Sequence, residues 1–390
     1  MEILSDMEVS ESPSLMARIA FQSTKFVIEL IDAGYKWRGG VAFACIHERY
    51  SSSLEIMPEN KIRIPKELYR PSLIISLWQV FSTAALWFGL WVWVDQTDSI
   101  WVNILCFFLS GMLIMRLFVL QHDCGHQNLF LRSRTNDIVG HVLAWITTVP
   151  YELWRSEHRW HHLHQGNLSK RGVDSVNSPP TVEEAKKDPH LVDLAYAKVS
   201  TIGVMIYGIY SIGFRRRSYK GFFLFREKFK WEVPKREELI RSIWVTHIGA
   251  FILQALLCYW LGWATYFLVV FPSYFLTGGL GSLLFWIQHN FEHSYFEWND
   301  DWEFQDAALH GSSYIKFFQP FTWFTANIGL HHVHHLNMKI PNYRLEAVRR
   351  AIPEVAAVEP LTWSDFRRSF ICLFWDEEKK RKVSLKPDSQ

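Results

Sequence analysis

The sequence contains few cysteines, almost no net charge and none of the short motifs that mark a soluble metalloprotease. Its 390 residues include five cysteines, none in CxxC spacing, which favours a reduced, cytosol-facing protein over a disulfide scaffold. The formal net charge of +2 and the lack of a basic block predict no nucleic-acid partner. The one His-Glu pair, His47-Glu48, has no histidine at position 51, which excludes an HExxH zinc site. The start, MEILSDMEVSES, is acidic and polar, so no cleaved signal peptide is expected.

Long uncharged segments are what the sequence has in abundance, with 49% hydrophobic and 16% aromatic residues. Residues 71–94 and 99–115 are both uncharged, and a membrane helix needs about 20 residues. Residues 242–291 contain no Asp, Glu, Lys or Arg, which is enough for two more spans divided at Gly262 or Pro272. A soluble helical core is the alternative, but soluble helices show a polar face and these segments show none.

The distribution of Lys and Arg predicts the orientation of these spans. Neither the DQTD turn after residue 94 nor the expected turn near Gly262 contains a Lys or Arg, whereas the two ends and residues 120–241 contain nearly all of them. By the positive-inside rule those regions face the cytosol. Two shorter apolar runs, 138–151 and 199–214, are too short for a comfortable span and are expected in the membrane interface. We therefore expect an all-α integral membrane protein with four transmembrane helices and both termini inside.

Histidines form three dense groups in the regions expected on the cytosolic side and one looser pair at the end of the last expected span. Spacings of three and four residues put side chains on one face of a helix. The groups are QHDCGH with His122 and His126, EHRWHH with His158, His161 and His162, HHVHH with His331, His334 and His335, and the pair His289 and His293 in QHNFEH.

Several such groups beside membrane segments on the same side would rarely arise by chance, so they predict a metal site. If residues 138–151 crossed the membrane, the first two groups would lie on opposite faces; as an interfacial segment they allow all groups to meet. Imidazole suits Zn, Cu, Fe and Ni, so ligand type leaves the metal open, while eight to ten histidines are enough for two ions. The nearby carboxylates Asp123, Glu157 and Glu292 are expected to orient the histidine rings by hydrogen bonds, with a plain exposed charge as the alternative for each.

These stretches together make the chain similar to a known family. It resembles the membrane fatty acid desaturase superfamily, most closely the bacterial-type acyl-lipid desaturases, from about Leu68 to about Leu345. The stretches that carry the resemblance are QHDCGH, EHRWHHLHQGNLSKRGV, QHNFEHSYFEW, ALHGSSYIKF and TANIGLHHVHHLNMKIPNYRL. The expected organisation is an N-terminal cytosolic or interfacial region (1–67), the desaturase domain (68–345) and a C-terminal cytosolic tail (346–390).

What the resemblance implies is a four-span enzyme whose cytosolic helical cap holds a histidine-rich, non-haem di-iron centre. Such enzymes use O2 and two electrons to introduce a cis double bond into a fatty acyl chain. Family members have a further ligand near the end of the last span, for which His293 is the best match and His289 the weaker one. The other ligands implied are His122, His126, His158, His161, His162, His331, His334 and His335.

The implied partners are membrane lipid, a fatty acyl substrate bound to lipid, CoA or a carrier, and an external electron donor. No CxxxxCxxC run, GxGxxG motif or HPGG segment is present, so ferredoxin or cytochrome b5 is expected as a separate protein. The membrane would be the endoplasmic reticulum or a bacterial inner membrane. A hydroxylase, acetylenase or ketolase on the same di-iron fold is the alternative reading. A metal transporter is a remote one, because transporters place their ligands near the middle of the bilayer.

Overall fold

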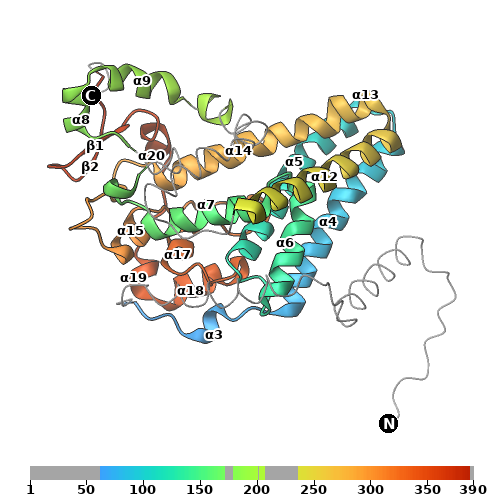
Figure 1. Ribbon diagram of the computed structural model, residues 1–390, viewed down its shortest axis with the longest axis horizontal. Coiled ribbons are helices and arrows are strands. Elements are labelled where there is room, and N and C mark those ends of the chain that lie inside the picture. Colours follow the sequence, from blue (N-terminus) through green and yellow to red (C-terminus); the bar gives the residue numbers. More distant parts are fainter. Residues whose placement is uncertain (1–61, 172–178, 201, 207–235, 387–390) are drawn as a thin grey trace, which may run out of the picture. The chain divides into compact units, whose positions relative to one another are not determined.

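The computed structural model describes residues 62–171, 179–200, 202–206 and 236–386, and the described part is mostly helical (Figure 1). Four of its helices are long and apolar enough to cross a membrane. They are α4 (Leu73–Asp95), α5 (Ile100–Gly125), α12 (Arg236–Leu261) and α14 (Phe271–His289), the last continuing a short α13 (Trp263–Thr265) and the π-helical η4 (Tyr266–Val270).

Exposed apolar side chains show why these helices need a membrane around them. Ile74 and Trp78 on α4 are 81% and 72% exposed, and Phe251 on α12 is 73% exposed. In water such apolar surfaces would carry a large free-energy cost, whereas in hydrocarbon they carry none. Their inner faces pack on one another, with α5 against both α4 and α14, around buried residues such as Trp91 and Leu117.

The last two spans are separated at Gly262, one of the two positions that the sequence offered for the break. Gly262 has φ 78, a left-handed conformation that glycine adopts without a steric cost. Pro272 instead lies in the first turn of α14, directly after the π-helical turn η4. Because proline has no N–H for the helical ladder, a local π turn is a common way of accommodating it within a longer helix.

Helix α6 (Ser133–Thr147) corresponds to the first short apolar run. Its 15 residues span about 22 Å, less than the roughly 30 Å of a hydrocarbon core. It packs against α5 and α12. The second short run, 199–214, lies largely outside the described residues, as do residues 1–61 of the expected N-terminal region.

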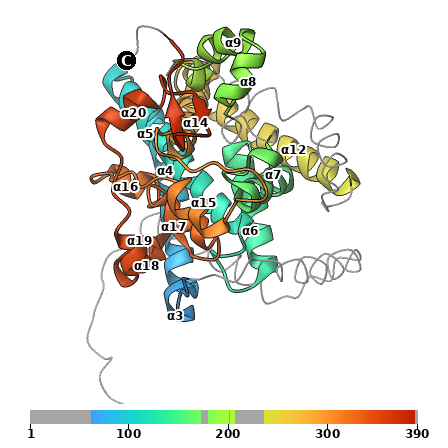
Figure 2. The same cartoon turned by 90° about the vertical axis from the view of Figure 1, so that its left-hand side faces the viewer.

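The histidine-bearing layer lies where α5 and α14 end, and Figures 1 and 2 both show α15 beside α17 there. Its own core includes Val333, Leu336, Ile340 and Val348. The layer contains α3 (Lys66–Tyr69), α7 (Tyr151–His164), η2 (Leu168–Lys170), α8 (Val182–Lys187), α9 (His190–Lys198), α15 (Phe304–His310), α16 (Phe321–Phe324), α17 (His331–Leu336), η5 (Asn342–Arg344), α18 (Leu345–Ala351), α19 (Pro353–Ala356) and α20 (Trp363–Arg368).

A small antiparallel hairpin, which no pattern in the sequence indicated, follows these helices. Strand β1 (Phe374–Asp376) pairs with β2 (Arg381–Val383), and Phe374 lies opposite Val383. Its inner side packs with Trp286 of α14 and Ala185 of α8. The backbone N–H of Lys382 donates to the carbonyl of Glu292 at 2.7 Å, which ties the C-terminal segment to the end of the last span.

Candidate metal centre

Five buried histidines form the first group, here called group A. Their ligand nitrogens all lie within 4.8 Å of one another. The members are His122 and His126 at the end of α5, His158 and His162 on α7, and His334 on α17.

Four more buried histidines form group B, again with ligand nitrogens within 4.8 Å of one another. The members are His161 on α7, His289 as the last residue of α14, and His331 and His335 on α17. The two groups are in direct contact, because the His162 and His335 rings stack with centroids 4.1 Å apart.

The HxxHH spacing explains how one helix supplies both groups. On α7, the pair spaced four residues apart, His158 and His162, points to group A, and His161 points to group B. On α17 the allocation is reversed: His331 and His335 belong to group B, and His334 belongs to group A. A side chain three residues along a helix is displaced to the other side of the stripe from one four residues along. Each short helix therefore bridges the two groups.

Distances within each group fit metal coordination. The Nε2 atoms of His158 and His162 are 3.0 Å apart, and the Nε2 atoms of His162 and His334 are also 3.0 Å apart. In group B, His289 Nε2 lies 2.9 Å from His331 Nε2 and 3.0 Å from His161 Nε2. Two imidazole nitrogens that bind one ion at about 2.1 Å, roughly at right angles, would be about 3.0 Å apart. The spacing is therefore that of ligands sharing an ion.

Burial keeps the imidazoles in the neutral form that metal binding requires. It lowers the pKa of six histidines well below the ordinary 6.5, and neighbouring histidines lower it further. The six are His126, His158, His162, His331, His334 and His335.

Hydrogen bonds to the far nitrogen orient several rings. His122 Nδ1 lies 3.2 Å from Asp123 Oδ1, and His289 Nδ1 lies 3.3 Å from the Gly311 carbonyl. These contacts leave Nε2 of each ring directed at its group. Within the described residues, the buried Nε2 atoms of His122 and His126 have no hydrogen-bond partner. A buried, orphaned nitrogen is costly unless something binds it, so the donor set fits a metal ion.

The three carboxylates expected behind the histidines have different surroundings. Asp123 is buried and contacts His122, while its Oδ2 accepts from the Asn342 backbone N–H and side-chain amide at 2.8 and 2.9 Å. Glu292 is buried but its carboxylate pairs with Arg368 and, at 3.2 Å, with Arg381. Glu157 is half-buried on α7. An orienting role is supported by the geometry at Asp123 and stays a prediction for the other two.

The structure places the two histidines near the last span in different surroundings. His289 is completely buried within group B, whereas His293 has an exposed side chain and lies outside both groups. The four-residue spacing between them would align both rings only if α14 continued through residue 293. The helix ends at His289, with Asn290 as its C-cap.

Three further histidines close to the groups lie outside them. His332 is buried on α17 and packs against Tyr314, with its pKa lowered to about 4 mainly by burial. The His164 ring stacks on the Trp160 ring with centroids 3.8 Å apart, and His310 at the end of α15 is exposed. The spacing of the histidines predicts none of these three as a ligand.

Asn342 is the residue near the site that sequence reasoning missed. It is buried, and its side-chain amide bonds Asp123 and, at 3.1 Å, the Gln79 side chain on α4. It thereby connects α4, α5 and the segment after α17. Asn342 lies in the stretch NMKIPNYRL, which carries part of the family resemblance, but no spacing rule singles out an asparagine there.

The chain matches known proteins along most of its length. The family model for fatty acid desaturases matches residues 98–367. A fatty acid desaturase of Bacillus subtilis (strain 168) is 32% identical over 320 residues, covering 81% of this chain and 88% of the relative. An sn-1 acyl-lipid omega-3 desaturase (ferredoxin) of Nostoc sp. is 27% identical, covering 76% and 79%. An sn-1 oleoyl-lipid 12-desaturase of Picosynechococcus sp. is 24% identical, covering 63% and 68%.

The family match and the four apolar helices confirm the expected fold class, an all-α membrane protein with a histidine-rich helical layer. The match includes both α7 and α17, which carry six of the nine clustered histidines. This chain belongs to the fatty acid desaturase family, whose members are oxidoreductases that introduce double bonds into fatty acyl chains.

Proposed function

We propose that the chain desaturates acyl chains of membrane lipids, using O2, at a di-iron centre held by groups A and B. The observation that carries this proposal is the pair of adjacent, buried, all-nitrogen groups to which α5, α7, α14 and α17 contribute. Two groups of five and four histidines offer ligands for two ions rather than one. The outcome proposed for the acyl chain is a cis double bond.

Iron is the metal proposed, because the family membership adds to what ligand type alone leaves open. When bound, the two ions would supply the activation of O2 and the acceptance of electrons that removal of two hydrogens requires. The ligands proposed are the nine histidines of groups A and B. The chain's own residues would hold the ions through neutral imidazoles, and Asp123 would keep the His122 ring oriented.

Aromatic side chains contact histidines of both groups. The Trp154 ring stacks on His158 at 4.5 Å and contacts Phe118 at 5.4 Å. Phe285 lies 5.1 Å from His161 and 5.2 Å from His289. Such apolar walls would exclude water and leave an acyl chain free to approach the ions.

The position of the groups at the ends of α5 and α14 supports a lipid substrate. An ion there would sit at the membrane face, within reach of chains that already lie in the bilayer. We infer from the Lys and Arg distribution that this face is cytosolic and that both termini lie on that side. The named relatives that act on acyl-lipids and use ferredoxin support an acyl-lipid substrate and a ferredoxin donor, with cytochrome b5 as the alternative donor.

The test is the fatty-acid profile of a desaturase-deficient host that expresses the chain, read by gas chromatography–mass spectrometry with double-bond derivatisation. A new unsaturated acid is expected from the natural chain and none from His334→Ala. The matched control is His310→Ala, which removes an exposed imidazole outside both groups and should retain the product. A hydroxylated, acetylenic or keto chain in place of the alkene would assign the alternative reaction. Absence of iron from the purified, folded protein would contradict the metal assignment.

A further inference from the structure

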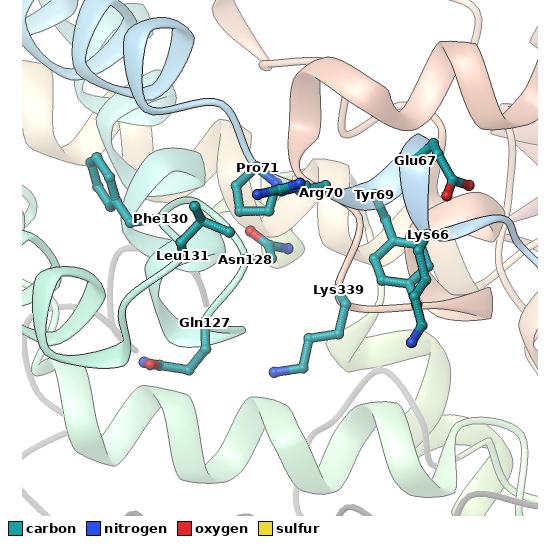
Figure 3. A pocket seen from close by; sticks show the side chains of 10 residues that line it. All are labelled: Lys66, Glu67, Tyr69, Arg70, Pro71, Gln127, Asn128, Phe130, Leu131 and Lys339. Atoms are coloured by element: carbon teal, nitrogen blue, oxygen red, sulfur yellow. The ribbon is translucent and has the colours of Figure 1, made fainter.

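A pocket of about 550 Å³ lies beside group A, between the segment that precedes α4, the loop that follows α5 and Lys339 (Figure 3). We call it the basic pocket, and its walls are Lys66, Glu67, Tyr69, Arg70, Pro71, Gln127, Asn128, Phe130, Leu131 and Lys339. The volume is within the range of small-molecule sites, about 300 to 1,000 Å³.

Cations dominate the charged side chains of the basic pocket. Lys66, Arg70 and Lys339 line it against the single carboxylate of Glu67. In the part of the chain that the structure describes, neither Lys66 nor Arg70 forms an ion pair, and both are exposed. Figure 3 shows Lys66 and Lys339 on the lower side of the pocket in that view and Arg70 beside Pro71. Cations that line one cavity without a carboxylate partner favour an anionic ligand, and phosphate above all.

The basic pocket lies where the first span begins. Pro71 lines it, and α4 starts two residues later with Leu73 and Ile74, which are 59% and 81% exposed. On the opposite wall Leu131 is 66% exposed. Exposed aliphatic side chains next to unpaired cations match the boundary between hydrocarbon and lipid head groups.

The same pocket is directly connected to group A. Gln127 and Asn128 in its wall follow His126 in the chain, and Lys339 Nζ donates to the His126 carbonyl at 3.1 Å. A head group held here would therefore have a constant position relative to the ions. The position of the double bond would then be set by its distance from the ester end of the acyl chain.

One buried polar atom in the pocket wall points to a ligand with hydrogen-bond donors as well as charge. Asn128 is only 2% exposed, and its amide nitrogen bonds the carbonyls of Met338 and Ile340 at 2.7 and 3.1 Å. Its Oδ1 has no partner within the described residues. An acceptor left in this state suits a hydroxyl group of the ligand.

We propose that the basic pocket binds the phosphate-bearing head group of a glycerophospholipid substrate, with Lys66, Arg70 and Lys339 on the phosphate and Asn128 on a head-group hydroxyl. The proposal rests on the acyl-lipid desaturation proposed above and names the class of lipid that the site takes. A neutral glycolipid would offer these three cations no anionic group.

Lipid binding to the purified, iron-loaded full chain, measured by native mass spectrometry, tests this proposal. The two probes share the same acyl chains: a phosphatidylglycerol and an uncharged monogalactosyl diacylglycerol. Lys66→Gln and Arg70→Gln should each weaken phosphatidylglycerol binding about fivefold, the factor that one cation contributes at a membrane surface. Galactolipid binding should not change. Arg63→Gln is the matched control, because it removes an exposed cation of the same segment outside the pocket.

The proposal would be overturned if both lipids bound equally. It would also be overturned if Lys66→Gln and Arg70→Gln left phosphatidylglycerol binding unchanged. Displacement of phosphatidylglycerol by an equal concentration of soluble glycerol 3-phosphate would identify a free-phosphate site instead of a lipid site. Because binding is measured without turnover, failure here is distinguishable from failure of desaturation. The protein could bind phosphatidylglycerol through both cations and still form no double bond in any lipid. That result would support the lipid site and contradict its role in substrate selection.

Discussion

At the scale of single residues, the position of a helix end decides which histidines can meet. His289 is in group B because α14 continues to that residue, and His293 is outside because the chain has already turned away. Asp123 shows the same dependence on position, since it contacts His122 beside it and Asn342 from the far end of the domain.

We expect His289→Ala to lose about half of the bound iron and His293→Ala to retain all of it. His289 is one of four nitrogen donors in group B, and removing one opens that site to water and weakens its ion. Iron per purified protein, measured by atomic absorption, reports the difference. Full iron in His289→Ala together with a loss in His293→Ala would contradict the assignment.

Lys382 provides a pH-dependent prediction away from the histidines. It is 2% exposed, its Nζ donates to Asn290 Oδ1, and burial lowers its pKa to about 7 from the ordinary 10.5. Between these values the unfolded chain binds more protons than the folded chain, so the free energy of unfolding rises with pH from about 7 upward. Below pH 7 both states are protonated and the contribution stays at its minimum.

The measurement is the melting temperature in detergent at pH 7 and pH 9, compared with Lys382→Met. The free energy of unfolding, derived from the melting data, should rise by about 2 kcal/mol more in the natural chain than in the variant between pH 7 and pH 9. One pKa unit corresponds to about 1.4 kcal/mol. Because other groups titrate in both proteins, only this difference is diagnostic. A difference that does not change with pH would show that Lys382 titrates normally.

At the scale of elements, close helix packing holds α7 in position to supply three histidines. Tyr151, the first residue of α7, donates its hydroxyl to the Cys124 carbonyl of α5 at 2.8 Å and packs over Gly140 of α6. A Cβ added at Gly140 would lie 2.3 Å from the Tyr151 ring. The absence of a side chain at this position is therefore what allows α6 and α7 to approach.

Gly140→Ala is expected to destabilise the protein by about 1 to 3 kcal/mol, as overpacking does, and to lower its iron content by displacing α7. Gly89→Ala on α4 is the matched control: nothing lies within 4 Å of its added Cβ, so the melting temperature should be unchanged or higher. Thermal unfolding and iron analysis of both variants provide the test. An unchanged Gly140→Ala protein would mean that the Tyr151 ring moves aside without consequence.

At the scale of the whole molecule, four spans place every clustered histidine in one layer. Group A receives ligands from the end of α5 and group B from the end of α14, so both ends must emerge on the same side of the membrane. The fold therefore requires an even number of crossings between them.

This topology predicts the outcome of cysteine labelling in intact bacterial spheroplasts. Asp98→Cys lies in the exposed turn between α4 and α5, and Asp300→Cys lies in the exposed loop after α14. A membrane-impermeant maleimide should label Asp98→Cys directly and Asp300→Cys only after permeabilisation, with the natural chain as the background. The reverse pattern would place the histidine layer outside the cytosol.

Much of this architecture is a local property of the chain and could therefore be predicted. Charge-free runs of sufficient length mark the spans, because hydrocarbon solvates no charge. The spacings HxxxH and HxxHH mark the ligand helices, because the helical period is the same wherever the helix lies. These two rules predict the positions of α4, α5 and the last two spans. They also predict eight of the nine clustered histidines, all except His289, as the preferred ligands.

What only the tertiary structure decided depends on contacts between distant segments. The division of the histidines into two groups results from packing α7 against α17, which are separated by more than 160 residues. The choice of His289 depends on where α14 ends, and the partnership of Asp123 with Asn342 depends on chain paths that no spacing records. The basic pocket likewise brings together residues near 66, 127 and 339. Local sequence specifies which face a helix offers, and only packing selects what that face meets.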